Sequence, residues 1–592
     1  MLQLRFKESS ACWEKYEAVS GVLEDITPAK YFFILYVFGL CVGGIIPLRQ
    51  TWWKESVVYQ VYWRSFYDTD GDGYGDLQGV IEKLDYIREL GVDVIWLNPI
   101  YSSPDEDNGY DISDYYTVME KAGTMRTWEK LLEETHRRGM KLIMDLVVNH
   151  TSDRHPWFIE SRSSRDNPKR DWYIWRDARE DGGPPNNWRS YFTPSVWEWD
   201  ERTGQYYFHS FATSQPDLNW ANPEVREEIY KMMRFWLDKG IDGFRLDAIA
   251  LLAKPDRFED AAHPQDIRYL TNNPGLHDYL REMNERVLRH YDIMTVGEVA
   301  FVTPEEGLKF VGEDRGELHT LFHFQVADEM PGWDMLRFKR IQRDWHRAMY
   351  GKGWIAQFLN NHDHVRQVSR YGNDGKYRVE SAKLLATMNH LLPGNPYIYQ
   401  GEEIGMTAVR FPSIHDYRDI MMRNRYEEET GKGRDPQEVL QELQRLSRDN
   451  SRTPMQWDDS ANAGFTTGEP WIGVNPNYTE IHVRKDLASP GSIYRYYQQL
   501  IALRRANPAA VYGDYEDLLP DDEHLYVFTR SYEGNRLLVM LNHADHESRL
   551  ELPAGLADEH RELLLANYPD VDPAASIKSC ILRPHEARVY RI

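Results

Sequence analysis

Eight short apolar runs, separated by stretches with helical spacing, follow one another between Trp52 and residue 403. The runs lie at 57–63, 92–99, 141–148, 242–248, 293–299, 321–325, 354–361 and 396–403. Between the first two, "LQGVIEKLDYIREL" places apolar residues three and four apart, which is typical of an amphipathic helix. Strands that alternate with helices form a parallel sheet, and eight of them predict a closed (β/α)8 barrel. The predicted fold class is therefore α/β, a TIM barrel.

Two other segments do not follow this alternation. Residues 151–218 are rich in Trp, Tyr, Pro, Asn and Asp and have little helical periodicity, which predicts a lobe inserted after strand 3. From about residue 516 the pattern changes to short strands such as "HLYVFTRSY" and "NRLLVMLNH", which predict an all-β sandwich. The predicted domains are an N-terminal extension (1–50), the barrel in two parts (51–150 and 219–515), the inserted B domain (151–218) and the C-terminal β-sandwich domain (516–592).

The N-terminal extension contains an uncharged apolar run, "YFFILYVFGLCVGGIIPL", at residues 31–48. The run is long enough to span a membrane, but it lacks the short basic start and the small-residue cleavage site of a secretory signal. Two interpretations remain open: a signal-anchor helix, or upstream sequence translated from a mis-assigned start, which we favour. We therefore expect a cytoplasmic protein, with membrane anchoring through 31–48 as the alternative.

Composition limits the partners that this chain can have. The net charge of -24 argues against a nucleic-acid partner. Only one of the three cysteines, Cys580, lies beyond the first fifty residues, so no disulfide framework or cysteine zinc site is possible there. The 19 tryptophans and 37 tyrosines indicate large cores, and stacking surfaces for a sugar are the second interpretation. We expect a monomer or a dimer.

Charged residues stand where core residues are expected, at the carboxyl ends of the predicted strands. Arg245 and Asp247 are two apart in "GFRLDA", so on a strand they point to the same face. Glu298 and Asp363 end two other strands, and unpaired like charges in a barrel mouth are costly. Clustered acids serve metal binding, proton abstraction or glycoside hydrolysis. Hydrolysis needs one protonated and one ionised carboxyl group, and an adjacent arginine keeps a nucleophilic carboxylate ionised.

Four motifs in order, "DLVVNH", "GFRLDA", "GEV" and "NNHD", resemble the signature regions of the α-amylase superfamily of glycoside hydrolases. Further stretches, among them "GDGYGDLQG", "DNGYDISDYY", "QPDLNW" and "SRTPMQWDD", resemble its oligosaccharide α-glucosidases, the maltase and oligo-1,6-glucosidase group. The resemblance runs from Trp52 to the C-terminus. It implies a retaining, exo-acting α-glucosidase that releases terminal, non-reducing α-linked glucose from short oligosaccharides or disaccharides.

The same motifs imply the roles of individual residues. Asp247 matches the nucleophile, Glu298 the general acid/base, and Asp363 the third acid, which binds sugar hydroxyls and stabilises the transition state. The implied substrate-binding residues are Asp107, Tyr110, His150, Phe192, Phe211, Gln215, Arg245, His362 and Arg452.

Within this set, Tyr110 is the expected aromatic platform under the sugar. Asp107 and Arg452 are the expected pair that grips the terminal glucose and closes the pocket. Taken alone, His150 would be an ordinary core residue and Asp107 an ordinary turn residue, so only the joint pattern supports their roles.

The stretch "DTDGDGYGD" at 68–76 is a separate signal. Its spaced acids and glycines resemble the start of an EF-hand loop without the distant glutamate, although such loops also occur as plain turns. Relatives in the α-glucosidase group bind calcium or magnesium at this loop. The resemblance implies a structural Ca2+, or Mg2+, held by Asp68, Asp70, Asp72, the Tyr74 carbonyl and Asp76.

The preferred linkage depends on Ala248, which follows the nucleophile. In relatives a small residue there accompanies α-1,4 cleavage and valine accompanies α-1,6 cleavage, so α-1,4 is slightly favoured. One alternative is a sucrose isomerase or transglucosylase of the same fold, but "FHFQVADEMPG" lacks the expected Arg-rich motif. The other is the membrane-anchored, α-glucosidase-like heavy chain of a transporter. It is disfavoured because all three catalytic acids are present.

Overall fold

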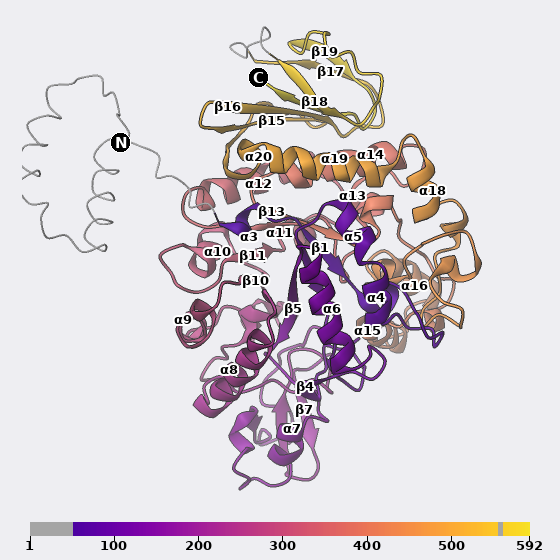
Figure 1. Ribbon diagram of the computed structural model, residues 1–592. Coiled ribbons are helices and arrows are strands. Elements are labelled where there is room, and N and C mark those ends of the chain that lie inside the picture. Colours follow the sequence, from indigo (N-terminus) through magenta and orange to yellow (C-terminus); the bar gives the residue numbers. More distant parts are fainter. Residues whose placement is uncertain (1–50, 554–560) are drawn as a thin grey trace, which may run out of the picture. The chain divides into compact units, whose positions relative to one another are not determined.

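The computed structural model describes residues 51–553 and 561–592 (Figure 1). The predicted N-terminal extension and its apolar run at 31–48 lie outside the described residues. Within the described ranges, no helix is both long and apolar enough to cross a membrane.

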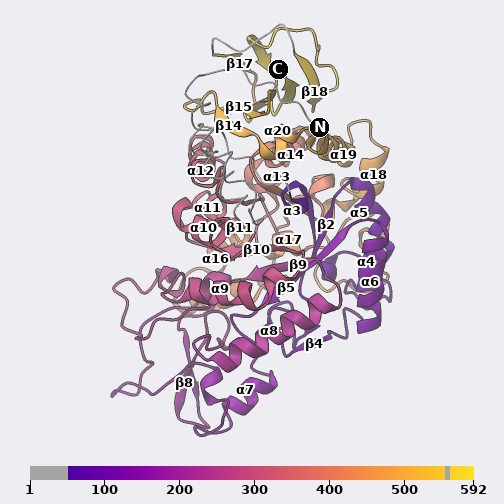
Figure 2. The same cartoon turned by 60° about the vertical axis from the view of Figure 1, so that its left-hand side comes forward.

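Eight parallel strands form the closed barrel that the sequence predicts. In order around the barrel they are β1 (Val58–Val61), β2 (Val94–Leu97), β5 (Lys141–Val147), β9 (Gly243–Asp247), β10 (Met294–Val299), β11 (Thr320–His323), β12 (Ala356–Gln357) and β13 (Asn395–Tyr399), which pairs again with β1. Figure 2 shows β2, β5, β9 and β10 next to one another. The prediction of a TIM barrel is confirmed. The last-but-one strand is much shorter than the apolar run at 354–361 suggested.

Helices follow the strands and cover the outside of the barrel, and local sequence signals explain where several of them begin. Helix α10 (Pro304–Val311) starts with a capping box between Thr303 and Glu306 and has proline at its first position. The other long helices of the barrel are α6 (Met125–Arg137), α8 (Pro223–Asp238), α9 (Leu276–Arg286), α12 (Met335–Met349), α14 (Arg378–Leu391) and α19 (Ile493–Ala506).

The chain leaves the barrel after β5 and returns at α8. In between, α7 (Pro156–Ser161) precedes a small antiparallel sheet of β6 (Trp175–Arg176), β8 (Gln205–Phe208) and β7 (Trp197–Asp200). The isolated bridge His150↔Asp217 joins the start and the end of this excursion, and a second bridge, Tyr173↔Leu218, joins its middle to its end. The excursion therefore begins and ends beside the carboxyl end of β5.

The C-terminal part is all-β, as predicted. A five-stranded antiparallel sheet has the order β14 (Asp514–Asp517), β15 (Leu525–Tyr532), β16 (Asn535–Asn542), β20 (Ala587–Arg591) and β18 (Glu562–Ala566). A second sheet pairs β17 (Ser548–Glu551) with β19 (Ser579–Leu582). Lys339 of α12 attaches this part to the barrel, because its ammonium donates to the carbonyls of Leu519, Asp522 and Leu525 at 2.6–2.7 Å. The domain boundaries stay predictions.

Candidate active site

The predicted catalytic side chains stand at the carboxyl ends of neighbouring strands. Arg245 and Asp247 belong to β9, Glu298 belongs to β10, and Asp363 follows β12. The register pairs Arg245 with Val296 of β10 on one side and with Asp145 of β5 on the other. Because parallel strands end at the same edge of the barrel, the pairing brings side chains that are far apart in sequence to one place.

A single guanidinium joins three carboxyl groups at this edge. Nη1 of Arg245 donates to Asp145 Oδ1 at 2.8 Å and also to Asp247 Oδ1, and Nη2 lies 2.9 Å from Glu298 Oε2. The side chain of Arg245 is 1% exposed and lies over the ring of Trp96, with 5.2 Å between the guanidinium carbon and the ring centroid. The planar fork of arginine suits such multiple pairing, whereas the point charge of lysine does not.

The environment gives the two central carboxyl groups different proton affinities. Burial raises the pKa of Asp247 to about 6, while the adjacent Arg245 opposes the rise. Burial also raises the pKa of Glu298 to about 7, with a further contribution from the charge of Asp247. Between these two values Asp247 is ionised and Glu298 is protonated. This is the division between nucleophile and acid that glycoside hydrolysis requires.

Asp363, which follows β12, stays charged. Its Oδ1 accepts from Arg452 Nη2 at 2.6 Å and lies 3.5 Å from Arg448 Nη1, and its Oδ2 lies 3.1 Å from His362 Nε2. Burial acts to raise the pKa of Asp363, but His362, Arg452 and Arg448 together hold it well below its usual range. A permanent negative charge is therefore fixed a short distance from the other two acids.

The structure pairs Asp107 with Arg448 and not with the expected Arg452. Asp107 Oδ1 accepts from Arg448 Nη2 at 3.1 Å, and the same nitrogen donates to Asp419 at 2.7 Å. Arg452 is occupied elsewhere, by Asp363 and by the His362 carbonyl at 3.0 Å. The two arginines are four residues apart on one helical turn, so both face the barrel mouth, and the earlier one is the one that reaches Asp107. The repeated arginine in "RDNSR" marks two candidates for the partner of Asp107, and the pattern by itself does not choose between them.

The predicted histidine and tyrosine lie together. The hydroxyl of Tyr110 is 2.8 Å from His362 Nε2, and the two rings are stacked with centroids 5.4 Å apart and planes at 6°. Asn98 donates to the same hydroxyl at 2.9 Å, and Gln60 Nε2 lies 2.8 Å from His362 Nδ1. Partners on both ring nitrogens of His362 and on the Tyr110 hydroxyl hold this part of the site rigid.

The inserted segment contributes the three residues that the sequence indicated. Gln215 donates to Asp107 Oδ2 at 3.2 Å, and the Phe211 ring lies 5.0 Å from the His150 ring. The Phe192 ring lies 5.4 Å from the Phe211 ring, and it also lies 4.8 Å from the guanidinium carbon of Arg448. The structure thus brings these side chains next to the Asp107–Arg448 pair.

The acid-glycine loop lies between β1 and α4 (Leu77–Glu82). Carboxylate oxygens of Asp68, Asp70 and Asp76 converge to within 4.8 Å of one another. Asp72 is outside this group, and its Oδ1 accepts from the Tyr74 amide at 2.8 Å. The convergent groups are all oxygen donors, which fits Ca2+ or Mg2+ and no softer metal.

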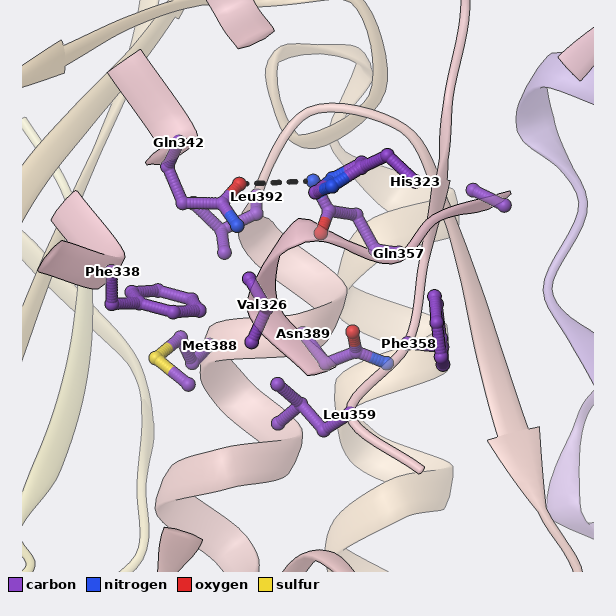
Figure 3. A pocket seen from close by; sticks show the side chains of 11 residues that line it. His323, Val326, Phe338, Gln342, Gln357, Phe358, Leu359, Met388, Asn389 and Leu392 are labelled. Carbon is purple, nitrogen blue, oxygen red and sulfur yellow. Dashed lines mark hydrogen bonds between the residues drawn. The ribbon is translucent and has the colours of Figure 1, made fainter. Parts of the chain in front are cut away.

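A recess that none of the predicted site residues lines is too small for a sugar. It lies between the ends of β11 and β12 and helices α12 and α14, has a volume of about 10 Å3, and is lined by residues that include His323, Gln342 and Gln357 (Figure 3). Gln357 donates to Gln342 across it at 3.1 Å. Such a volume holds one water molecule at most.

Comparison with known proteins gives a consistent result. The alpha-amylase catalytic-domain model matches residues 60–513. The oligo-1,6-glucosidase of Parageobacillus thermoglucosidasius is 54% identical, and the alignment covers 92% of this chain and 100% of the relative. The oligo-1,6-glucosidase of Bacillus cereus is 51% identical, with 92% and 100% coverage. The crystal structure of the isomaltulose synthase from Protaminobacter rubrum superposes with a TM-score of 0.89 at 43% identity, covering 92% of this chain and 100% of that one.

Proposed function

Because the chain belongs to the alpha-amylase catalytic-domain family, we propose that it is a retaining, exo-acting α-glucosidase that hydrolyses terminal, non-reducing α-linked glucose from short oligosaccharides. The observation that carries this proposal is the single guanidinium of Arg245 between Asp247 and Glu298. It holds two carboxyl groups of different pKa side by side, in a family whose members cleave glycosidic bonds.

The mechanism has two steps. Asp247 attacks the anomeric carbon while Glu298 gives its proton to the leaving oxygen, so the glycosidic bond breaks and a glycosyl–enzyme ester forms. Glu298, now ionised, then takes a proton from water, and the resulting hydroxide displaces Asp247 from the sugar. Asp363, held ionised by its cationic neighbours, stabilises the positive charge that develops on the ring in both transition states.

Exo-action is supported by the group at the far end of the site. Arg448 bridges Asp107 and Asp419, and Gln215 and Phe192 pack around the bridge. In the proposed arrangement the bridge grips the hydroxyls of the terminal glucose and leaves no room for a further unit. His150, Tyr110 and His362 then contact the same glucose.

For the linkage we propose a preference for α-1,4 bonds, supported by the small side chain of Ala248 next to the nucleophile. The relatives named oligo-1,6-glucosidase favour the competing α-1,6 preference. Values of kcat/KM on maltose and isomaltose decide between them. A cytoplasmic location, supported by the cysteine count beyond residue 50, stays a prediction.

Asp247→Asn tests the proposal as a whole. An amide cannot act as the nucleophile, so kcat should fall by more than about a thousandfold while the fold is retained. Asp242→Asn is the matched control. Asp242 lies just before β9 at the other end of the barrel, where it pairs with His136 and Lys141, so this variant should keep its turnover. If Asp247→Asn keeps more than a few per cent of the wild-type rate, with deamidation excluded, the assignment is wrong.

The proton affinities predict a bell-shaped pH profile of kcat/KM. Activity should rise with pH through about 6, as Asp247 ionises, and fall through about 7, as Glu298 loses its proton. Glu298→Gln should abolish the alkaline limb and lower the rate on maltose by about 10²–10⁴-fold. It should slow the first step on p-nitrophenyl α-glucoside far less, because that leaving group needs no proton. Equal losses on both substrates would exclude Glu298 as the acid.

The proposed binding of the terminal glucose by Asp107, Arg448 and Asp419 predicts the order in which products appear. Early digestion of maltotetraose, followed by chromatography, should yield glucose and maltotriose. Arg448→Met removes the bridge between Asp107 and Asp419 and should raise KM by about tenfold, the cost of one hydrogen bond to a charged group. The same change at the exposed Arg423 of the neighbouring helix is the control and should leave KM unchanged. Maltose as the main early product of the wild type contradicts a one-glucose pocket.

We also propose that the acid-glycine loop binds a structural Ca2+ or Mg2+, supported by the convergence of three of its carboxylates. A cation that binds only the folded chain raises the melting temperature by mass action. Chelator should therefore lower the melting temperature and calcium should restore it, both read by calorimetry. Asp70→Asn should lose the response, because Asp70 offers a ligand without capping α4 as Asp76 does. A wild type that is indifferent to chelator refutes the site.

A further inference from the structure

Lys254, which the mechanism above does not use, is buried beside the active site. It follows the nucleophile strand by seven residues, and its side chain is only 7% exposed. Its ammonium has three acceptors: Asp217 Oδ2 at 2.9 Å, Asn149 Oδ1 at 2.9 Å and the Leu251 carbonyl. An ammonium has three protons to donate, so all of its hydrogen-bonding capacity is directed to fixed groups within the protein.

These acceptors belong to three different segments. Leu251 ends the short 3-10 helix (Ile249–Leu251) in the loop after β9, Asn149 lies just beyond the carboxyl end of β5, and Asp217 lies at the end of the inserted segment. Asp217 also accepts from the backbone and the hydroxyl of Ser210, at 2.8 and 2.6 Å. The lysine therefore ties the inserted segment and the loop behind the nucleophile to the strand that carries His150.

The orientation of the Asn149 amide follows from this arrangement. An ammonium can only donate, so the amide oxygen must face Lys254 and the amide nitrogen must face His150, whose Nδ1 is 3.2 Å away. An amide nitrogen can likewise only donate, so Nδ1 of His150 must be the acceptor. Burial lowers the pKa of His150, so the ring is neutral near pH 7 and its one proton is on Nε2.

Nε2 is the nitrogen that faces the active site. It lies 3.2 Å from the Tyr110 carbonyl, a hydrogen-bond acceptor, and 3.2 Å from Gln215 Nε2, whose own acceptor is Asp107. With its proton on Nε2, His150 presents a donor to this part of the site, and the Tyr110 carbonyl is the acceptor for it. The other tautomer would present a lone pair there instead.

We propose that Lys254 is a positioning residue which, through the amide of Asn149, holds His150 in the Nε2–H tautomer and so fixes its hydrogen bond to the carbonyl of Tyr110, a residue proposed to contact the bound glucose. The tautomer itself follows from the contacts above, and its effect on catalysis rests on the proposed function. Lys254 touches neither the substrate nor the reacting atoms. Its influence passes through the three groups that accept from its ammonium: Asn149, Asp217 of the inserted segment and the Leu251 carbonyl.

The test reads the tautomer directly. Full-length protein labelled with 15N-histidine is studied by long-range 1H–15N correlation, and the signals of His150 are those that disappear in His150→Gln. The wild type should show the proton on Nε2. Lys254→Met frees the Asn149 amide to rotate and should produce a population protonated on Nδ1. Asn149→Asp keeps the partner of Lys254 but places an acceptor against Nδ1, so it should move the proton to Nδ1.

Lys339→Met is the matched control, because Lys339 is also buried and donates to three acceptors, all carbonyls far from the site. It should destabilise the fold without changing the tautomer. On maltose, Lys254→Met should lower kcat/KM by about tenfold relative to Lys339→Met, without moving either limb of the pH profile.

Two results overturn the proposal: a wild-type His150 protonated on Nδ1, or a His150 that stays protonated only on Nε2 in either test variant. Equal losses of kcat/KM in Lys254→Met and Lys339→Met would show a merely structural role and also overturn it. If the wild type shows no glucosidase activity, the proposed function fails, but the tautomer shift still tests the contact between Lys254, Asn149 and His150.

Discussion

The active site depends on one ionic interaction, the contact of the Arg245 guanidinium with Asp145, Asp247 and Glu298. Three carboxyl groups at the buried end of a barrel repel one another, and each loses the solvation of water. The rigid fork of one arginine compensates for both costs, and it can do so only because neighbouring parallel strands bring the four residues to the same end of the barrel. The barrel strands therefore hold Arg245 close enough to all three carboxyl groups to offset the cost of burying them.

The charge of Arg245 does not fully offset the cost of burying these carboxylates, and Asp247 and Glu298 therefore have different pKa values. Burial raises the pKa of both Asp247 and Glu298 above the values of free side chains, and the shared guanidinium opposes each rise. Asp363 has three cationic or polar neighbours of its own, and its pKa moves in the other direction. Three carboxyl groups within one site thus differ in pKa because of the partners that surround each of them.

The sequence predicts the features that depend on the barrel more completely than the pairing of side chains on loops. Apolar runs mark strands that are buried on both faces, and a strand fixes where its last residues point, so Arg245, Asp247 and Glu298 could be placed in advance. Arg448 could not. It lies at the start of a four-residue helix after a long excursion, and which of two arginines one turn apart reaches Asp107 depends on backbone placement that no local pattern specifies. The two-residue strand β12 was likewise overestimated, because apolar side chains continue beyond the hydrogen-bonded ladder.

The division between barrel strands and loops also separates the residues proposed for the reaction from those proposed for substrate specificity. The acids proposed to break the bond stand on strands, whereas the groups proposed to surround the terminal glucose come from the inserted segment, the loop at Asp107 and the helix at Arg448. Loops need fixed anchoring to bind a sugar in one orientation, and here the anchors are buried polar contacts: Lys254 with Asp217, and Arg448 with Asp419. Buried charge pairs add little net stability compared with apolar packing, but breaking one is costly, so they specify one arrangement of the loops over others. Relatives of the same fold that carry different names can therefore share the strand-end acids and differ in the loops that surround them.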